Sequence, residues 1–251
     1  MRILDINLDF FLNKTPYNRP LYSNKRLSGR EYKPWNAVDV CNFLESRCGI
    51  SKPVKGRVLK HHDEAFFFWK ELISNDLLEL PFDVVHSDSH ADIGYGDLGC
   101  SYLMSELLHQ PTERRQTPDC AFNAMNTGNY LDFTIACHWI KSLTYVNHDN
   151  IPRDLLPIYF KDFSIYSGYI ELNKLDRDIF DEICSGRRIH DTYESWRVIG
   201  TEPPVPFYHV NLEDFINDKP FNFIVLAQSP SFTPIKSDDL IPVICKYIDC
   251  V

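Results

Sequence analysis

The sequence predicts an α/β domain of three layers, in which helices cover both faces of a mostly parallel sheet. One observation is that the apolar stretches at 81–85 and 222–227 lack polar alternation, which is typical of buried strands. A second is that a predicted strand at 55–60 runs directly into a predicted helix at 65–73. A third is that polar side chains gather where these strands end, which is where α/β sheets hold their functional sites.

Length and composition indicate one globular domain over residues 1–251. A chain of 251 residues with 44% hydrophobic and 14% aromatic residues can bury a sizeable core, which argues against a disordered protein. The formal net charge of -9 argues against a general binder of nucleic acid or of anionic membranes, and it suits a cationic substrate. The sequence does not indicate an oligomeric state.

Cysteine usage and the N-terminal residues indicate the compartment. The eight cysteines form no Cys-x-x-Cys pair and lie in apolar or mixed surroundings, as reduced core cysteines do. The first residues lack the apolar core of a signal peptide because Asp5 interrupts it, and no 18-residue apolar stretch predicts a membrane span. We therefore expect a cytoplasmic protein.

The elements follow from hydrophobic periodicity and from the residues that break it. The predicted strands are 2–8, 55–60, 81–85, 142–146 and 222–227. The predicted helices are 35–46, 65–73, 129–140, 212–216 and 238–248. A long loop at 13–35 has the character of a lid or binding segment. The glycine-rich loop at 93–99 lets the backbone approach a ligand, although it lacks the Gly-Lys-Ser of a phosphate loop.

Three candidate metal ligands follow the strand at 81–85 at every second position. Side chains alternate along a strand, so Asp88 and His90 share a face, and a turn after them brings Asp92 back to the same point. Two carboxylates and an imidazole at the C-terminal end of a buried strand are suited to a divalent metal. This stretch therefore predicts a metal site, with one or two ions.

Two other strand ends carry polar groups of the same kind. The first strand places Asp5, Asn7 and Asp9 on one face, and a buried strand with a polar face needs a compensating charge such as a metal. His61 and His62 stand between a predicted strand and the helix at 65–73. Many carboxylates with a minority of imidazoles favour Mn²⁺ or Fe²⁺ over a thiolate zinc site. Two adjacent ions make hydroxide available at neutral pH, which predicts hydrolysis at a trigonal carbon.

The remaining histidines have no spacing argument, and the sequence predicts structural roles for them. These are His86, His109, His148, His190 and His209. His138, next to Cys137, is predicted to pack within a helix, and it is also the candidate acid for protonating a leaving amine.

These stretches together resemble the divergent arginase-like, ureohydrolase-related family that contains the peptide arginases. The motifs are LDINLDFF at 4–11, HHDEA at 61–65, HSDSHAD at 86–92, NYL at 129–131 and QSPSFT at 228–233. The resemblance implies the αβα sandwich of arginases and deacetylases and a centre of two Mn²⁺ ions. It also implies the reaction: arginine residues of a ribosomally made precursor peptide are converted to ornithine, and urea is released.

The resemblance also implies ligand roles. Asp88 bridges the two metals, and His90 and Asp92 bind one metal each. His62 fits the upstream histidine of the family, with His61 as the fallback. The remaining ligand pair is Asp5 with Asn7 or Asn7 with Asp9, because a regular strand would place Asp5 and Asp9 about 13 Å apart. Either pair includes an amide, which binds a second metal more weakly than a carboxylate does.

The chain departs from the arginase pattern in two ways. The acidic strand comes first in the chain, so the sheet is permuted or the N-terminal strand inserts beside its partners. Gln228 stands where arginases have a glutamate that holds the guanidinium, and Asp97 or Glu64 is the candidate for the missing charge. The substrate-side candidates are Tyr95, Asp97, Gln228 and Asn129, of which Asn129 joins Asp88 and His90 as a catalytic candidate.

Other functions stay open at this point. A small-molecule ureohydrolase would use the same ligands, whereas a deacetylase uses one zinc with fewer carboxylates. A peptide-binding module with a vestigial metal site would explain Asn7 and the missing glutamate. Metal content separates the last alternative from the enzymes.

Overall fold

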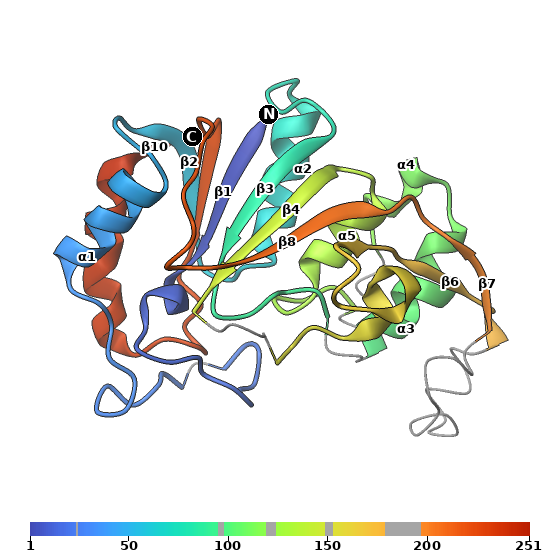
Figure 1. The fold of residues 1–251 in the computed structure, drawn as a ribbon, viewed down its shortest axis with the longest axis horizontal. Coiled ribbons are helices and arrows are strands. Elements are labelled where there is room, and N and C mark those ends of the chain that lie inside the picture. The colour runs from blue at the N-terminus through green and yellow to red at the C-terminus, as the bar shows by residue number, and fades with distance from the viewer. Residues whose placement is uncertain (24, 95–97, 119–123, 149–152, 179–196) are drawn as a thin grey trace.

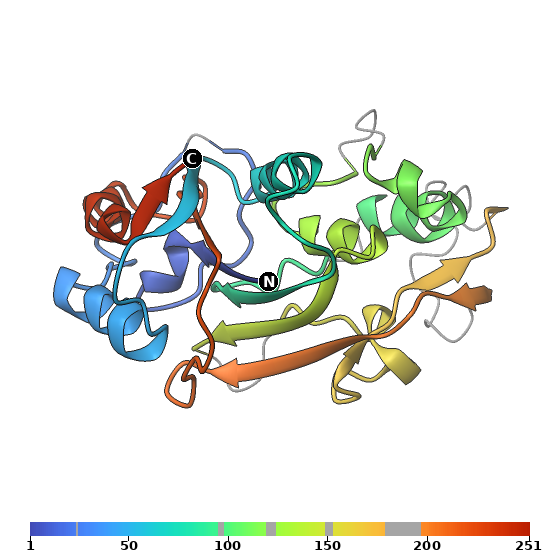
Figure 2. The same ribbon diagram turned by 90° about the horizontal axis from the view of Figure 1, so that it is seen from above.

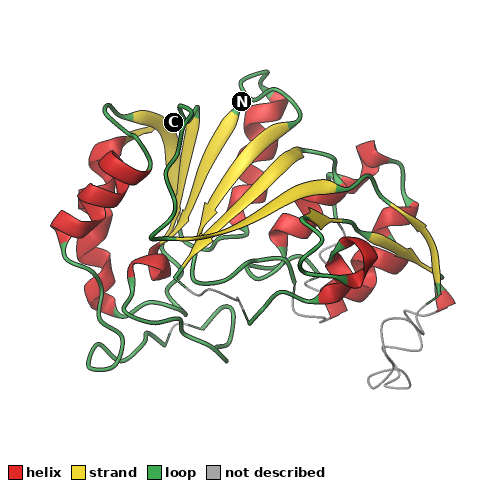
Figure 3. Cartoon of the chain, in the orientation of Figure 1, coloured by secondary structure: helices red, strands yellow, loops and turns green. Residues whose placement is uncertain are grey.

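The computed structural model describes residues 1–23, 25–94, 98–118, 124–148, 153–178 and 197–251. A mostly parallel sheet of eight strands forms the centre, in the order β10-β2-β9-β1-β3-β4-β8-β5, and helices flank it (Figures 1 and 3). Only β5 is antiparallel to its neighbour, β8. The predicted α/β fold class is confirmed. No helix in these residues is long and apolar enough to cross a membrane.

The strands of the large sheet are β1 (Arg2–Asn7), β2 (Val54–Leu59), β3 (Phe82–Ser87), β4 (Ile140–Asn147), β5 (Tyr169–Ile170), β8 (Val205–Asn211), β9 (Phe223–Ala227) and β10 (Ile248–Cys250). A small antiparallel sheet pairs β6 (Asn173–Leu175) with β7 (Val198–Thr201). The α-helices are α1 (Ala37–Asn42), α2 (Glu64–Ser74), α3 (Leu98–Ser105), α4 (Thr112–Arg115), α5 (Tyr130–Ala136) and α7 (Ile241–Ile244). Short turns of other helix types are η1 (Leu8–Phe11), η2 (Phe43–Arg47), η3 (Leu107–His109), η5 (Pro157–Tyr159), η6 (Lys161–Phe163), η8 (Ile235–Leu240) and η9 (Cys245–Tyr247).

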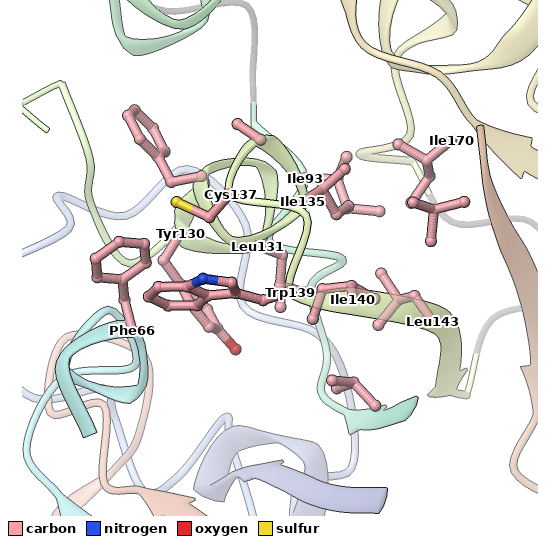
Figure 4. Close-up of a cluster of buried hydrophobic side chains, with 14 of the residues drawn as sticks. Phe66, Ile93, Tyr130, Leu131, Ile135, Cys137, Trp139, Ile140, Leu143 and Ile170 are labelled. Carbon is pink, nitrogen blue, oxygen red and sulfur yellow. The ribbon is translucent and has the colours of Figure 1, made fainter. Parts of the chain in front are cut away.

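Two hydrophobic cores lie on the two faces of the sheet. On one face, α2, α3 and α5 pack on side chains that include Ile3 of β1, and Figure 4 shows Phe66 and Trp139 of this core, whose rings stack 4.8 Å apart. On the other face, α1 and α7 pack on side chains that include Leu4 and Ile6 (Figure 2). Because side chains alternate along a strand, Asp5 lies on the face of Ile3, inside the first core.

The position of β1 settles how the N-terminal strand joins the sheet. It lies between β9 and β3 and is parallel to both, so the first strand of the chain is inserted at the centre. Its register with β3 places Asp5 directly beside His86. The arrows of β1 and β3 point to the same edge of the sheet in Figure 1, so polar residues after the two strands meet there.

Two predicted elements are shorter in the structure. The predicted strand at 2–8 ends at Asn7, and Leu8–Phe11 forms the 3-10 turn η1. The predicted helix at 129–140 is shorter, because α5 ends at Ala136, His138 adopts a left-handed φ of 58°, and β4 begins at Ile140.

Two helices at the C-terminal part of the chain were predicted wrongly. Residues 212–216 form only a turn, in which the amide groups of Asp214 and Phe215 both bond to the carbonyl of Asn211. Residues 238–248 do not form one amphipathic helix. They are divided among η8, α7 and η9, and Ile248 joins the sheet as the start of β10.

Candidate metal centre

Seven buried side chains meet at the C-terminal ends of β1, β2 and β3, and we call them the His/Asp cluster. They are Asp5, Asp9, His62, His86, Asp88, His90 and Asp92. Three groups of three among them have ligand atoms within 4.8 Å of one another, and each group can hold a metal ion. The groups are Asp5 with His62 and His86, Asp9 with Asp88 and His90, and His62 with Asp88 and Asp92.

His62 connects two of these groups through its two ring nitrogens. Its Nε2 lies 3.1 Å from Oδ1 of Asp5, where the imidazole N–H donates to the carboxylate. Its Nδ1 lies 2.9 Å from Oδ2 of Asp88 and 3.0 Å from Oδ2 of Asp92. A neutral His62 with its proton on Nε2 therefore presents the Nδ1 lone pair beside two carboxylate oxygens, which is a metal-binding arrangement.

His90 is oriented in the same sense by the N-terminal loop. Its Nε2 lies 3.1 Å from the carbonyl oxygen of Pro16, and because a carbonyl only accepts, Nε2 carries the proton. Its Nδ1 lies 3.2 Å from Oδ2 of Asp9 and 3.6 Å from Oδ1 of Asp88. The neutral ring therefore turns its lone pair toward these two carboxylates.

Asp88 lies between the two histidines. Its Oδ2 faces Nδ1 of His62, and its Oδ1 faces Nδ1 of His90 while accepting the backbone N–H of His90 at 2.8 Å. Each carboxylate oxygen thus belongs to a different group of candidate ligands. This is the geometry of a carboxylate that bridges two ions.

Several atoms of the cluster have no hydrogen-bond partner among the residues that the structure describes. They are Oδ2 of Asp9, Nδ1 of His62, Oδ2 of Asp88 and Oδ2 of Asp92. A buried polar atom without a partner is costly, and buried charges are normally paired or bound to a metal. Oxygen and imidazole ligands that converge in this way fit a divalent cation, so these residues are suited to a metal site.

The pKa values of the cluster residues also indicate that a positive charge is required there. Burial and the neighbouring charge of Asp88 raise the pKa of Asp9 and of Asp92 to about 7. Burial opposes the charged form of His62 and of His90, but the adjacent carboxylates raise the pKa of both well above the usual value. Without a cation, the carboxylates are thus compensated by protons, which a divalent ion would replace.

His86 was predicted to be structural, yet it lies inside the cluster. Its Nε2 donates to the carbonyl of His90 at 3.1 Å, and its Nδ1 lies 2.9 Å from Oδ2 of Asp5. The hydroxyl of Tyr130 donates to the same oxygen of Asp5. The available signal was the series His86, Asp88, His90 at every second position, which extends the predicted motif backwards by one step.

Asp5 therefore has hydrogen-bond donors on both carboxylate oxygens. Oδ1 accepts from His62, and Oδ2 accepts from His86 and Tyr130. Burial alone would raise the pKa of Asp5. The charges and hydrogen bonds of His62 and His86 have a larger effect in the opposite direction, so the pKa of Asp5 lies well below its usual value. In this geometry Asp5 lies behind His62 and orients the ring.

Asn7 and Asp9 are separated by the turn η1. The side-chain oxygen of Asn7 accepts the backbone N–H of Asp9 at 3.4 Å, which caps the turn. The expectation of a regular strand through Asp9 was therefore wrong, and the distance estimated from it does not apply. The structure brings Asp5 and Asp9 into different groups of the same cluster. His61 lies outside the groups, with its ring 5.2 Å from that of Tyr22.

Of the four substrate-side candidates, the structure describes Asn129 and Gln228. Both ends of the Asn129 amide bond to backbone atoms of its own loop, at 2.7 Å to the N–H of Asn126 and 2.7 Å to the carbonyl of Ala124. Gln228 is half-buried at the end of β9, where its backbone N–H bonds to Leu59. Tyr95 and Asp97 lie outside the described residues. Glu64 accepts the backbone N–H groups that precede α2.

A cavity of about 440 Å³ adjoins the cluster at His90. We call it the His90 pocket, and its lining is Tyr17, Asn18, Arg19, Leu21, His90, Arg153, Asp154, Leu156 and Phe232. Tyr17, Asn18 and Arg19 belong to the long loop that the sequence identifies as a binding segment. The cavity therefore gives a ligand access to the side of the cluster that carries His90.

Comparison with known proteins adds no family assignment. No protein-family model matches the chain, and no curated protein matches it. The molecule is thus an α/β protein with a mostly parallel eight-strand sheet and a buried His/Asp cluster that is suited to metal ions.

Proposed function

We propose that the His/Asp cluster binds two divalent metal ions and that the protein is a metal-dependent hydrolase. The observation that carries this proposal is the orientation of Asp88, which presents one carboxylate oxygen to each of two groups of ligands. The atoms of Asp9, His62 and Asp92 that have no partner among the described residues support it, because one cation in each group would satisfy them.

The ligand atoms divide into two sets that share Asp88. One set is Nδ1 of His62, Oδ2 of Asp88 and Oδ2 of Asp92. The other is Oδ2 of Asp9, Oδ1 of Asp88 and Nδ1 of His90. Asp5 supports the first set without belonging to it. It accepts a hydrogen bond from Nε2 of His62 and so fixes the ring, as carboxylates do for metal-bound histidines. Such oxygen-rich sets favour Mn²⁺ or Fe²⁺, and the proposal takes Mn²⁺.

The proposed reaction is the hydrolysis of arginine residues in a precursor peptide to ornithine, with release of urea. Divalent ions bound in the cluster would supply a hydroxide nucleophile at neutral pH. The oxygen of water adds to the guanidinium carbon, the bond to the side-chain nitrogen of arginine breaks, and both water protons end on that nitrogen. The choice of substrate is supported by the five motifs that resemble the arginase-like family.

The chain itself contributes enclosure and orientation to this reaction. The cluster is buried, which keeps bulk water from the reacting atoms and strengthens every charge interaction there. Asp5 and Pro16 fix the ring orientations of His62 and His90 through hydrogen bonds. His138 bonds to Glu202 away from the cluster, so the proposal assigns it no proton transfer.

The test is mass spectrometry of an arginine-containing peptide, preferably a genomic-neighbour precursor, incubated with the protein and Mn²⁺. Hydrolysis predicts a loss of about 42 Da per converted arginine, the mass of urea less that of water. Asp88→Ala and a chelator should abolish the loss, and Asp249→Asn, at an exposed position, should retain it. Turnover of free arginine or of an acylated amine, with no peptide modified, would replace this proposal by a small-molecule ureohydrolase or a deacetylase.

A further inference from the structure

The His90 pocket contains two arginine side chains beside the proposed reaction centre. Arg153 is exposed, and its guanidinium lies 5.7 Å from the ring centre of Tyr17. Arg19 is half-buried and lines the same cavity. Tyr17 in turn packs edge-on against the His90 ring, with centroids 6.0 Å apart. The two guanidinium groups thus belong to the wall that leads to a candidate metal ligand.

Neither of these arginines is neutralised by a carboxylate among the described residues. Arg19 donates from Nε to the carbonyl of Ser231 at 3.1 Å and from Nη2 to that of Lys25 at 2.7 Å, so it is held in place with its charge retained. Within the described part of the chain, the contact of Arg153 is with the ring of Tyr17. Elsewhere the chain pairs arginines closely, as in Arg26 with Asp238 at 2.6 Å.

The acidic residue of the pocket does not cancel this charge. Asp154 is buried, and its Oδ2 accepts the backbone N–H of Ala91 at 2.7 Å, which fixes the loop that carries His90. Among the described residues, Asp154 forms no ion pair with Arg19 or Arg153. A chain of net charge -9 therefore has, in the cavity beside its candidate reaction centre, two cations that no described carboxylate pairs with.

We infer that the His90 pocket binds a carboxylate of the substrate, namely an Asp or Glu side chain close to the arginine that is hydrolysed. This inference rests on the proposed function. A guanidinium pairs with a carboxylate through two parallel hydrogen bonds, so Arg153 recognises an acidic side chain more strongly than a neutral one. The aromatic rings of Tyr17 and Phe232 cover the apolar part of the bound segment. The substrate is thus a peptide with an acidic residue next to its arginine.

The experiment compares peptides that differ only beside one arginine, with both peptide ends blocked. The neighbour is Glu, Gln or Lys, and a fourth peptide has a neutral neighbour and a free C-terminal carboxylate on the arginine. KM and kcat are measured by mass spectrometry with Mn²⁺, and binding is measured by fluorescence polarisation with and without Mn²⁺. We expect the Glu peptide to bind about fivefold or more tightly than the Gln peptide at low salt, with the difference in KM.

Variants of Arg153 make the test specific. Arg153→Glu should reverse the order so that the Lys peptide binds best, and Arg153→Lys should keep a reduced preference for Glu. Arg114→Glu, at an exposed arginine of α4 outside the pocket, should leave the preference unchanged. Equal binding of the Glu and Gln peptides, or a preference that survives Arg153→Glu, would overturn the inference.

The readouts separate this inference from the proposed function. Hydrolysis without any preference overturns only the pocket assignment. Binding with the expected preference but no loss of urea contradicts only the proposed reaction. Tight binding of the fourth peptide alone would assign the pocket to a terminal carboxylate, and the inference of an acidic side chain would be wrong.

Discussion

Two groups of charged side chains in the described part of the molecule have buried carboxylates, one at the ends of the central strands and one between α4 and the end of β7. The second group, which we call the Glu202 cluster, consists of Arg115, His138, Lys174 and Glu202. Arg115 donates from both terminal nitrogens to the two oxygens of Glu202, at 2.9 and 3.0 Å. Nε2 of His138 lies 2.6 Å from Oε2 of Glu202, and Nζ of Lys174 lies 2.8 Å from Oε1.

The two clusters differ in whether the protein satisfies them. Every oxygen of Glu202 has two donors, and the remaining N–H groups of Arg115 bond to backbone carbonyls. The His/Asp cluster contains four carboxylates, and atoms of Asp9, Asp88 and Asp92 have no donor among the described residues. A closed set of this kind is part of the fold, whereas an open set with excess acceptors is suited to hold a cation.

The largest effect is expected from Asp88→Ala. Because both candidate metal sets share this carboxylate, its loss should weaken Mn²⁺ binding about a thousandfold or more and remove activity. Isothermal titration with Mn²⁺ measures this, with Asp249→Asn as the control at an exposed aspartate. Affinity within about threefold of wild type would mean that Asp88 does not bridge two ions.

Glu202→Ala should break the closed cluster without touching the open one. The change leaves Arg115 buried with no carboxylate, which lowers the free energy of unfolding by about 4 kcal/mol. Urea denaturation in the presence of a chelator measures the loss. Mn²⁺ affinity should stay unchanged, and a parallel loss of affinity would show that the two clusters are not independent.

The pH dependence of stability should distinguish the Glu202 cluster further. Burial raises the pKa of Glu202, but Arg115, Lys174 and His138 lower it from 4.5 to about 2. A carboxylate with a lowered pKa stabilises the folded state above pH 4.5, and this contribution is lost as pH falls from 4.5 toward 2. The difference in unfolding free energy between wild type and Glu202→Gln should therefore shrink by about 2 kcal/mol over that range. A constant difference would contradict the assignment.

The smallest effect is expected from Tyr130→Phe. This change removes the hydroxyl that donates to Asp5, so Asp5 holds His62 less firmly. Loss of such a supporting group lowers metal affinity about tenfold, or about 1.4 kcal/mol. Mn²⁺ titration measures it, and Tyr166→Phe at an exposed ring serves as the control. No change would mean that the contact between Tyr130 and Asp5 does not affect His62.

The sequence predicts the centre of the fold better than its edges. The buried strand β9 is apolar throughout, and β3 contains the apolar pair Val84 and Val85, so their patterns alone identify them. The segment at 238–248 has helical periodicity, but its last residue, Ile248, pairs with Val54 of β2 in the sheet and is not part of a helix. The turn at 212–216 depends on bonds to the backbone of Asn211, which periodicity does not record.

For the candidate site, local spacing predicts one part and tertiary pairing supplies the rest. Alternation after β3 places Asp88 and His90 in the cluster directly. The contact between His86 and Asp5 requires β1 to pair with β3, which no local pattern specifies. Asp9 reaches the cluster only because Asn7 caps a turn at the end of β1.

The measurement that tests the central claim most directly is the number of Mn²⁺ ions bound per chain after equilibrium dialysis, determined by elemental analysis. The two ligand sets that share Asp88 predict two ions in the wild-type protein. Asp9→Asn should retain one, because only its own set loses a carboxylate. A wild-type chain that binds no Mn²⁺, with the His/Asp cluster still folded, would contradict the account and leave the cluster as a proton-stabilised part of the core.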